Sequence, residues 1–290
     1  SAVQPMAVGS NEKLRAISPR DQRCSMGTWD PRQYQRFQKE RAQPFFDLLN
    51  RVPDGEVATV ADLGCGPGTL TVTLTQRWEH ATIWGVDNSP QMLAEAATLP
   101  SQTNLHFVQS DIGVWQPERL LDRIISNAAL QWLPEHGALL ARLVSLLVPQ
   151  GILGVQMPNN FAEAAHQILG ETVRQAKWRA TLEDCREHYF GQSPQWYAEA
   201  LQDLGCTVQV WETIYYHILS GENAVLEWMK GTALRPVLSR LDADQQAAFL
   251  EEYGQKLSQA YPAGPSGTIF PFRRLFFIAQ RAQLSAQRAA

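Results

Sequence analysis

Short apolar runs alternate with amphipathic segments over the first half of the chain. The apolar runs are rich in β-branched residues and predict strands, which lie at residues 57–63, 83–86, 105–108, 121–126 and 152–156. The intervening segments have helical spacing and lie at residues 69–78, 90–97 and 137–147. Strands that alternate with helices predict an α/β fold with a mostly parallel sheet, covered by helices on both faces.

The regular alternation of strands and helices ends after Pro158. Helices are predicted at residues 161–179, 194–204, 222–230 and 243–259, and two long strands at residues 207–216 and 268–279. Because helical segments separate these two late strands, we expect an antiparallel sheet edge with a helical insertion before the last strand.

An amphipathic helix is also predicted near the N-terminus, over residues 31–49. Large or charged side chains recur there at helical spacing, at Tyr34, Phe37, Arg41, Phe45 and Leu48. Asp30 can cap this helix, and Pro31 suits its first turn. Residues 1–25 show no such period, so we expect an extension outside the fold.

The composition narrows the class of protein and the kind of partner. With 290 residues, 44% of them hydrophobic and 19% charged, the chain is expected to form one large α/β domain with appendages. Its net charge is −4 and its Lys and Arg residues are scattered, which argues against a nucleic-acid partner. The sequence has neither an apolar run of membrane-spanning length nor a signal core, so we expect a cytoplasmic protein with no membrane partner. No protein partner is evident from the sequence; the expected partner is a small-molecule substrate.

The cysteines carry little chemical signal. Cys24, Cys65, Cys185 and Cys206 show neither a CxxC pair nor a metal-ligand spacing. We therefore expect four free thiols, with no disulfide and no metal site. Cys65 lies inside a glycine-rich turn, which is the most informative segment of the chain.

This turn follows the first predicted strand, with Gly64, Gly66 and Gly68 at alternate positions. Glycines at a strand-to-helix turn let backbone amides approach a polar ligand without an intervening Cβ. Asp87 ends the next strand, where a carboxylate can accept hydrogen bonds from both hydroxyls of a ribose. A glycine turn alone would equally suit a plain connection, but together with Asp87 it favours a nucleotide-type ligand.

Further residues distinguish S-adenosylmethionine (SAM) from a dinucleotide. SAM carries an α-ammonium where a dinucleotide has a pyrophosphate, and Asp62 at the start of the turn can face that ammonium. Asp111 and Ile112 end the third strand and can contact the adenine amino group and ring, although Asp111 would equally suit a helix N-cap. The methionine end of the ligand is expected to contact the residues after the fourth strand, which are Asn127, Gln131 and Trp132.

In these residues and in several later motifs, the chain resembles the class I SAM-dependent methyltransferases, and more narrowly the trans-aconitate 2-methyltransferase family. The likeness covers roughly residues 29–281, with motifs at residues 29–31, 62–68, 87–92, 127–132, 155–158, 215–217, 231–236 and 272–276. The resemblance implies a Rossmann-like, seven-stranded, mostly parallel sheet. It also implies that SAM binds at the carboxyl edges of the first strands, where Asn88 and Met92 add to its site.

The reaction of that family transfers the SAM methyl group to a carboxylate of trans-aconitate. A carboxylate is ionised near neutral pH, so the reaction needs alignment and exclusion of water more than a general base. The resemblance implies catalytic roles for Tyr34, Asn159, Tyr215 and His217. It implies substrate binding by Trp29, Phe37, Arg41 and Arg273, with His217, Arg235 and Arg274 as further candidates to hold carboxylates of the substrate.

Departures from the family pattern keep other functions open. Gln43 replaces a cation in the N-terminal helix, Asn159 replaces an aspartate, and no proline precedes His166. The azetidine-2-carboxylate synthases resemble the same family; they cyclise SAM itself and release methylthioadenosine, which requires a neutral amine and an aromatic wall rather than a cationic pocket. A catalytically silent scaffold is a third alternative, which the intact glycine turn and Asp87 disfavour.

These assignments divide the chain into six segments. They are an N-terminal extension (residues 1–25), a helical lid (26–56), the SAM-binding core (57–158), cap helices (159–206), edge strands with the helical insertion (207–281) and a C-terminal tail (282–290). The lid and the late insertions are expected to roof a substrate pocket.

Overall fold

The computed structural model describes residues 38–182 and 190–283. Its centre is one sheet with the strand order β3-β2-β1-β4-β5-β8-β6. The strands are β1 (Thr59–Leu63), β2 (Thr82–Asp87), β3 (Leu105–Gln109), β4 (Leu121–Asn127), β5 (Leu147–Pro158), β6 (Cys206–Leu219) and β8 (Gly267–Arg281), and the short β7 (Ala263–Gly264) pairs with β8. Strands β1 to β5 pair in parallel, and β8 runs antiparallel to both β5 and β6. The predicted sheet, mostly parallel with an antiparallel edge, is confirmed.

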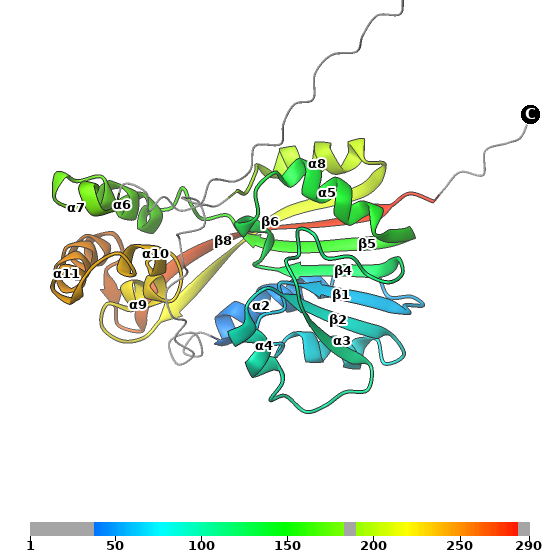
Figure 1. Cartoon of the computed structure of the whole chain (residues 1–290). Helices are drawn as coiled ribbons and strands as arrows, with labels where there is room; N and C mark the ends of the chain where they lie inside the picture. The colour runs from blue at the N-terminus through cyan, green and yellow to red at the C-terminus, as the bar shows by residue number, and fades with distance from the viewer. Residues whose placement is uncertain (1–37, 183–189, 284–290) are drawn as a thin grey trace, which may run out of the picture.

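Helices cover both faces of this sheet (Figure 1). They are α2 (Gln38–Leu49) and α3 (Thr71–Arg77) on one face, and α5 (His136–Ser145) and α8 (Pro194–Asp203) on the other. Phe45 and Leu48 of α2 are fully buried against strand residues, and Leu143 of α5 is fully buried on the opposite face. Two short helices stand at the carboxyl edge of the sheet, α4 (Pro90–Ala96) after β2 and η2 (Leu130–Trp132) after β4.

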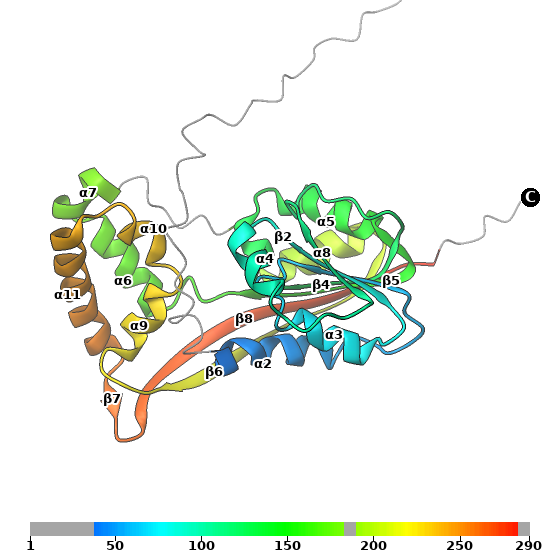
Figure 2. The same ribbon diagram turned by 60° about the horizontal axis from the view of Figure 1, so that its bottom comes forward.

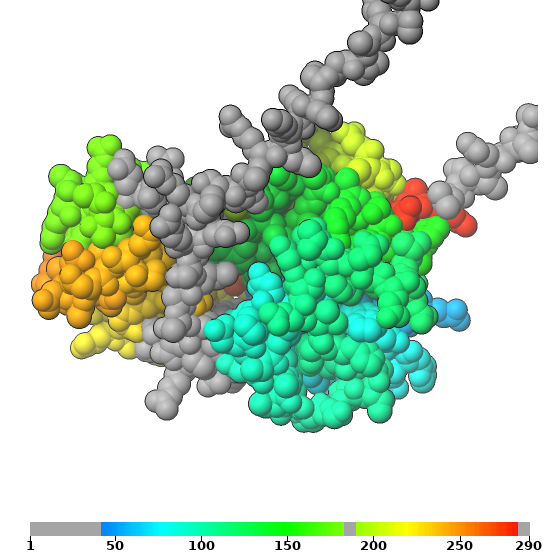
Figure 3. Space-filling model, in the orientation of Figure 1, coloured from blue at the N-terminus to red at the C-terminus, as the bar shows by residue number. Residues whose placement is uncertain are grey.

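A second group of helices, the helical lobe, packs around the far ends of β6 and β8 (Figures 1 and 2). It consists of α6 (Ala164–Val173), α7 (Ala176–Leu182), α9 (Ala224–Lys230), α10 (Arg235–Leu238) and α11 (Ala243–Ala260). Trp228, Phe249 and Phe270 belong to its buried cluster, which β6 and β8 share with the helices. These two strands are 14 and 15 residues long, and they join the lobe to the core as one continuous ribbon. Figure 3 shows the lobe beside the core.

The predicted strands agree with the observed ones to within a few residues, and the differences have packing causes. β6 continues past the predicted end because Leu219 is buried in the lobe. The single helix predicted over residues 161–179 is two helices, and the break after α6 turns Trp178 and Leu182 of α7 into the lobe core. The short elements α10, η2 and β7 were not predicted, because they contain too few residues to show a period.

The segments expected on either side of the core differ in their packing. Of the N-terminal helix, the structure describes the part from Gln38, whose apolar side lies on the sheet. The cap helices divide between two places, since α6 and α7 join the lobe whereas α8 packs against β6. The boundaries of the six segments stay a prediction.

The described residues can be searched for membrane-spanning helices, metal-binding clusters and disulfides, which the sequence did not predict. None of the helices in the described ranges is both long and apolar enough to cross a membrane. Over the same ranges, acidic, histidine and cysteine side chains form no cluster that could hold a metal ion. Cys65 and Cys206 are free thiols, as expected, whereas Cys24 and Cys185 lie outside the described residues.

Candidate functional site

The glycine turn connects β1 to α3 at the carboxyl edge of the sheet. All three glycines have positive φ angles, of +78° at Gly64, +54° at Gly66 and +74° at Gly68. A Cβ at Gly64 would lie 2.2 Å from the Cβ of Ala129, and one at Gly68 would lie 2.5 Å from the ring of Phe107. Gly64 and Gly68 are therefore required by close packing as well as by backbone conformation.

Gly66 differs, because its Cβ position is open. The nearest atom is the Sδ of Met92, at 4.0 Å. The amide of Gly66 donates to Oδ2 of Asp87 at 2.9 Å, and the amide of Ser89 donates to Oδ1 of Asp87, also at 2.9 Å. The carboxylate of Asp87 is thus held beside the turn while its remaining lone pairs can accept hydroxyl groups of a ligand. Asn88, next in the chain, is exposed.

Asp62 is a buried acid beneath this turn. Its side chain is 3% exposed, and Oδ2 accepts a hydrogen bond of 2.7 Å from the hydroxyl of Thr71, the first residue of α3. Burial raises the pKa of Asp62 to about 6; the hydrogen bond from Thr71 opposes this rise, and the charge of Asp87 adds to it. A ligand cation near Asp62 would relieve that cost, because it stabilises the ionised form.

The residues after β3 are held partly by the fold itself. Oδ1 of Asp111 accepts a hydrogen bond of 2.7 Å from the amide of Gly113, so this exposed side chain organises its own turn. Ile112 is 8% exposed and belongs to the core cluster on the α5 face. The expected adenine contacts of both residues stay predictions.

At the end of β4, two side-chain oxygens are available to a ligand. Gln131 is 3% exposed, and its Nε2 donates to the carbonyl of Ala128 at 2.8 Å, which leaves Oε1 as the remaining acceptor. Neither Oε1 of Gln131 nor Oδ1 of Asn127 has a hydrogen-bond partner among the described residues, although both atoms are buried. Buried polar atoms normally have partners, so both oxygens suit a donor such as an ammonium. Trp132 is 43% exposed.

A further buried polar pair lies in β5 and β8, the next two strands of the sheet after β4. Gln156 of β5 stands opposite Asn127, and Arg274 of β8 stands opposite Pro158. The Nη1 of Arg274 donates to Oε1 of Gln156 at 3.3 Å, and the two side chains are 4% and 0% exposed. Sequence reasoning missed Gln156, although a glutamine inside an otherwise apolar buried strand was a visible signal.

Tyr215 and His217 lie on the same face of β6. The hydroxyl of Tyr215 donates to Oδ2 of Asp47 in α2 at 2.5 Å. Burial, together with Asp47, raises the pKa of Tyr215, so the phenol is neutral. His217 is 7% exposed and stacks on Trp228 of the lobe, with ring centroids 5.1 Å apart. Both residues border the junction of core and lobe.

Arg273 and Asn159 belong to a network on the opposite face of the ribbon. Arg273 lies 3.7 Å from a carboxylate oxygen of Glu163 and 3.6 Å from one of Glu212. The Nδ2 of Asn159 donates to the other oxygen of Glu212 at 2.8 Å. The two acids balance the charge of Arg273, and the network lies at the surface, because the Arg273 side chain is 36% exposed.

The remaining expected residues divide between described and undescribed parts of the chain. Trp29, Tyr34 and Phe37 lie outside the described residues, and of Arg41 only the backbone, in α2, is described. Burial lowers the pKa of Arg235, which begins α10 in the lobe. Gln43 donates to Asp47 at 2.8 Å. The roles expected for these residues stay predictions.

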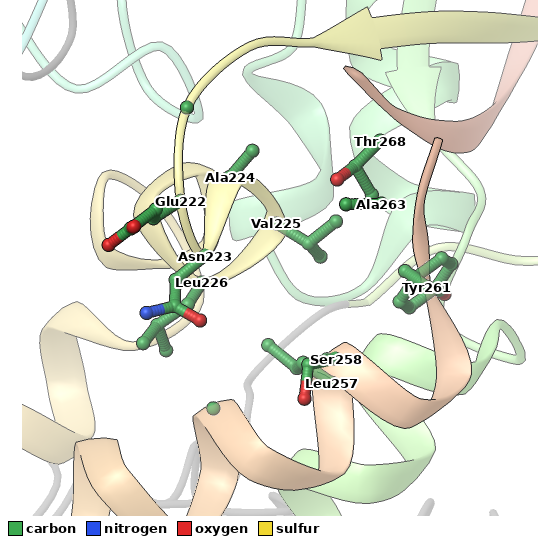
Figure 4. A pocket seen from close by; sticks show the side chains of 12 residues that line it. Glu222, Asn223, Ala224, Val225, Leu226, Leu257, Ser258, Tyr261, Ala263 and Thr268 are labelled. Carbon is green, nitrogen blue, oxygen red and sulfur yellow. The ribbon is translucent and has the colours of Figure 1, made fainter. Parts of the chain in front are cut away.

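A separate cavity of about 320 Å³ opens in the helical lobe (Figure 4). Its walls are the turn before α9, the last turns of α11 and the β7–β8 hairpin, including Val225, Leu257 and Tyr261. None of its lining residues comes from β1 to β5, and none is among the expected site residues. This cavity is therefore distinct from the polar edge of the sheet.

Comparison with known proteins adds independent findings. A family model described as a methyltransferase domain matches residues 60–151. A trans-aconitate 2-methyltransferase of Streptomyces avermitilis is 46% identical over 265 residues, which cover 89% of this chain and 98% of the relative. A protein of the same name from Escherichia coli O157:H7 is 44% identical over 261 residues, which cover 89% of this chain and 100% of the relative.

Solved structures agree in fold at much lower identity. The YcgJ protein of Bacillus subtilis matches with a TM-score of 0.52 at 12% identity, over 83% of this chain and 99% of that one. A phosphoethanolamine N-methyltransferase of Haemonchus contortus, solved with S-adenosylhomocysteine, matches with a TM-score of 0.50 at 15% identity, over 83% of this chain and 53% of that one. At such identities, the likeness concerns the fold alone.

Proposed function

Because the chain belongs to the trans-aconitate 2-methyltransferase family of class I SAM-dependent methyltransferases, we propose that it methylates a carboxylate of a small polycarboxylic acid related to trans-aconitate. The observation that carries the proposal is the carboxylate of Asp87, held against the glycine turn by the amides of Gly66 and Ser89. That arrangement supports a SAM site of the kind the family uses.

The donor and acceptor groups at the sheet edge fit SAM. Asp87 would accept the ribose hydroxyls, and the open side of Gly66 would let the ligand approach the backbone. The α-ammonium would face Asp62 together with the side-chain oxygens of Asn127 and Gln131, the two that have no partner among the described residues. When bound, SAM supplies a methyl carbon that is attacked by the carboxylate oxygen, so that a C–O bond forms while the C–S bond breaks and its electron pair stays on sulfur.

The strand order supports a position for the acid. Asp87 ends β2, the glycine turn follows β1, and Asn127 ends β4, so these residues follow the ligand from ribose to methionine. Continuing in the same direction, the next strands are β5, β8 and β6, which carry Gln156, Arg274 and Tyr215. The acid would lie at this side of the edge, with its water excluded by buried side chains.

Methylation of the acid does not require the protein to remove a proton from it. An acid carboxylate is ionised near neutral pH, so rate depends on alignment in a dry site. Tyr215 is neutral and its one hydroxyl proton goes to Asp47, so it would hold α2 against β6 beside the acid, and His217 would form part of the wall. Catalytic roles for Tyr34 and Asn159 remain part of the proposal.

The cyclase alternative receives less support from the described residues. Cyclisation of SAM needs a neutral amine, whereas Asp62, with a pKa of about 6, is ionised at neutral pH and would favour the ammonium. Asn159, which would suit a neutral amine, is held by Glu212 in the network of Arg273, on the opposite face of the ribbon from Arg274 and Tyr215. A buried guanidinium beside the methionine end also disfavours a sulfonium cation as the only substrate.

The test is a product assay by mass spectrometry. We expect no turnover with SAM alone, and formation of S-adenosylhomocysteine and a monomethyl ester once trans-aconitate is added. Methylthioadenosine with a four-membered amino acid from SAM alone would establish the cyclase instead. If a panel of di- and tricarboxylic acids gave neither product, the scaffold alternative would hold and the proposal would be wrong.

A further inference from the structure

Two buried amide side chains, Gln131 after β4 and Gln156 in β5, are left with opposite chemical groups unpaired among the described residues. Nε2 of Gln131 is occupied by the carbonyl of Ala128, so its carbonyl oxygen is left to accept. Oε1 of Gln156 is occupied by Arg274, which can only donate, so its Nε2 is left to donate. Gln131, after β4, therefore suits a hydrogen-bond donor of a ligand, whereas Gln156, in β5, suits an acceptor.

Two neighbouring arginines of β8 end on opposite faces of the ribbon, because successive side chains of a strand alternate. Arg273 faces outward, where Glu163 and Glu212 lie within 3.7 Å. Arg274 faces inward, where it contacts Gln156 and covers the ring of Phe272 at 4.5 Å from the ring centroid. It is also close enough to Tyr215 for its charge to act on that phenol. Alternation thus brings only Arg274 to the Gln156 face.

We propose that Gln156 and Arg274 bind a second carboxylate of the acid, the one that is not methylated, and thereby select substrates with at least two carboxylates. This inference rests on the proposed function and deepens it. Nε2 of Gln156 and the guanidinium of Arg274 are both donors, and a carboxylate can accept one hydrogen bond from each. The family resemblance alone implied Arg273, with Arg274 only as a further cationic candidate.

The surroundings of the pair make such an anchor selective. Both side chains are buried, so a carboxylate bound there loses its water and depends on these donors. The Phe272 ring and Oε1 of Gln156 hold the guanidinium in one orientation, which pre-organises it for a planar anion. An acid that lacked the second carboxylate would leave the buried Nε2 of Gln156 without an acceptor, and such sites discriminate strongly.

The test compares acids with three, two and one carboxylates: trans-aconitate, fumarate and crotonate. For the wild-type protein we expect kcat/KM to fall at least about 100-fold from fumarate to crotonate. Equal activity on crotonate and fumarate would overturn the inference while leaving carboxylate methylation intact. Absence of ester from all three acids would instead contradict the proposed function.

The principal variant is Gln156→Glu, which keeps the acceptor for Arg274 but removes the free donor and adds a negative charge. We expect kcat/KM for trans-aconitate to fall about 100-fold, with crotonate and the Kd of SAM changed less than about 3-fold. The matched change Gln131→Glu should alter the Kd of SAM and leave the ratio between the acids as in the wild type. An unchanged acid ratio in Gln156→Glu, with normal SAM binding, would overturn the inference.

Variants of the two arginines distinguish the proposed anchor, Arg274 with Gln156, from the surface network of Arg273. Arg274→Lys keeps the charge but loses the planar fork, and it should lower kcat/KM for trans-aconitate about 10-fold or more without affecting crotonate. Arg273→Gln tests the competing assignment, in which Arg273 binds the second carboxylate. If it removed selectivity while Gln156→Glu and Arg274→Lys retained it, the anchor would be Arg273. A raised Kd of SAM in Gln156→Glu with selectivity retained would assign the pair to the carboxylate of SAM and overturn the inference.

Discussion

The proposed cofactor half of the sheet edge, around Asp62, Gly66 and Asp87, and the proposed acceptor half, around Gln156, Arg274 and Tyr215, are built in different ways. In the cofactor half, the bonds that shape the site join residues close in sequence, since Asp62 and Thr71 are 9 positions apart and Gly66 and Asp87 are 21 apart. In the acceptor half, Gln156 and Arg274 are 118 positions apart, and Asp47 and Tyr215 are 168 apart. The cofactor half uses backbone amides and glycines, whereas the acceptor half uses side chains from α2, β5, β6 and β8.

This difference means that the two halves should fail in different ways when they are altered. Changes in the glycine turn should disturb the backbone and hence both stability and SAM binding. Changes among the side chains of the acceptor half should leave the backbone in place and act on the acid. The following variants test that separation, in order of decreasing effect.

The largest effect is expected for Gly64→Ala. Its Cβ would lie 2.2 Å from that of Ala129, at a φ of +78°, so we expect a loss of at least about 3 kcal/mol in the free energy of unfolding. Denaturant titration measures this loss. Gly66→Ala is the matched control, because its Cβ position is open and only the φ strain of about 1 kcal/mol remains; it should instead weaken SAM binding. Equal losses of stability in the two variants would contradict the assigned roles.

Asp62→Asn should stabilise the ligand-free protein while it weakens SAM binding. The pKa of Asp62 rises from 3.8 to about 6 on folding, so the folded protein holds a proton more tightly. Stability contributed by the protonated acid is therefore lost as pH rises from about 4 to about 6, and the full cost, up to about 3 kcal/mol, applies at pH 7.

Measurements of unfolding at several pH values check this expectation. The asparagine variant should exceed the wild type at pH 7 and converge with it below about pH 4, since both side chains are then neutral. A variant less stable than the wild type at pH 7 would show that the ionised carboxylate has a partner that offsets its burial.

A smaller effect is expected for Tyr215→Phe, in the acceptor half. It removes the hydrogen bond to Asp47 between α2 and β6, which should cost about 1 to 2 kcal/mol of unfolding free energy. The KM for the acid should rise while the Kd of SAM stays within about 3-fold of the wild type. If the Kd of SAM rose as much as the KM of the acid, the separation between the two halves would not hold. Calorimetry and initial rates provide the two readings.

Sequence reasoning was most successful for elements with a clear period. Alternating strands and helices predicted a mostly parallel sheet, the two long late strands predicted an antiparallel edge, and the structure confirms both. The helix predicted over residues 161–179 was wrong in its continuity, because the packing of Trp178 in the lobe, not the local pattern, sets the break. The lobe itself could not be predicted, since its cluster joins α6 and α7 to helices that come after β6.

For the site, the sequence indicated Asp62, Gly66 and Asp87 and the structure brings them to one turn, with hydrogen bonds that no pattern states. It assigned substrate binding to Arg273 and kept Arg274 as a further candidate, without a physical reason for that choice. Two adjacent arginines look alike in a sequence, and only the register of β8 against β5 and β6 decides which faces Gln156 and which faces Glu163.

The sequence by itself therefore determined the local structure of the proposed cofactor half, because a turn with glycines at alternate positions dictates its own backbone and the acid after the next strand lies beside it. Only the tertiary structure decided the acceptor half. Gln156, Arg274, Tyr215 and Asp47 meet through strand pairing and helix packing across more than half of the chain, and no local propensity encodes which face each side chain takes.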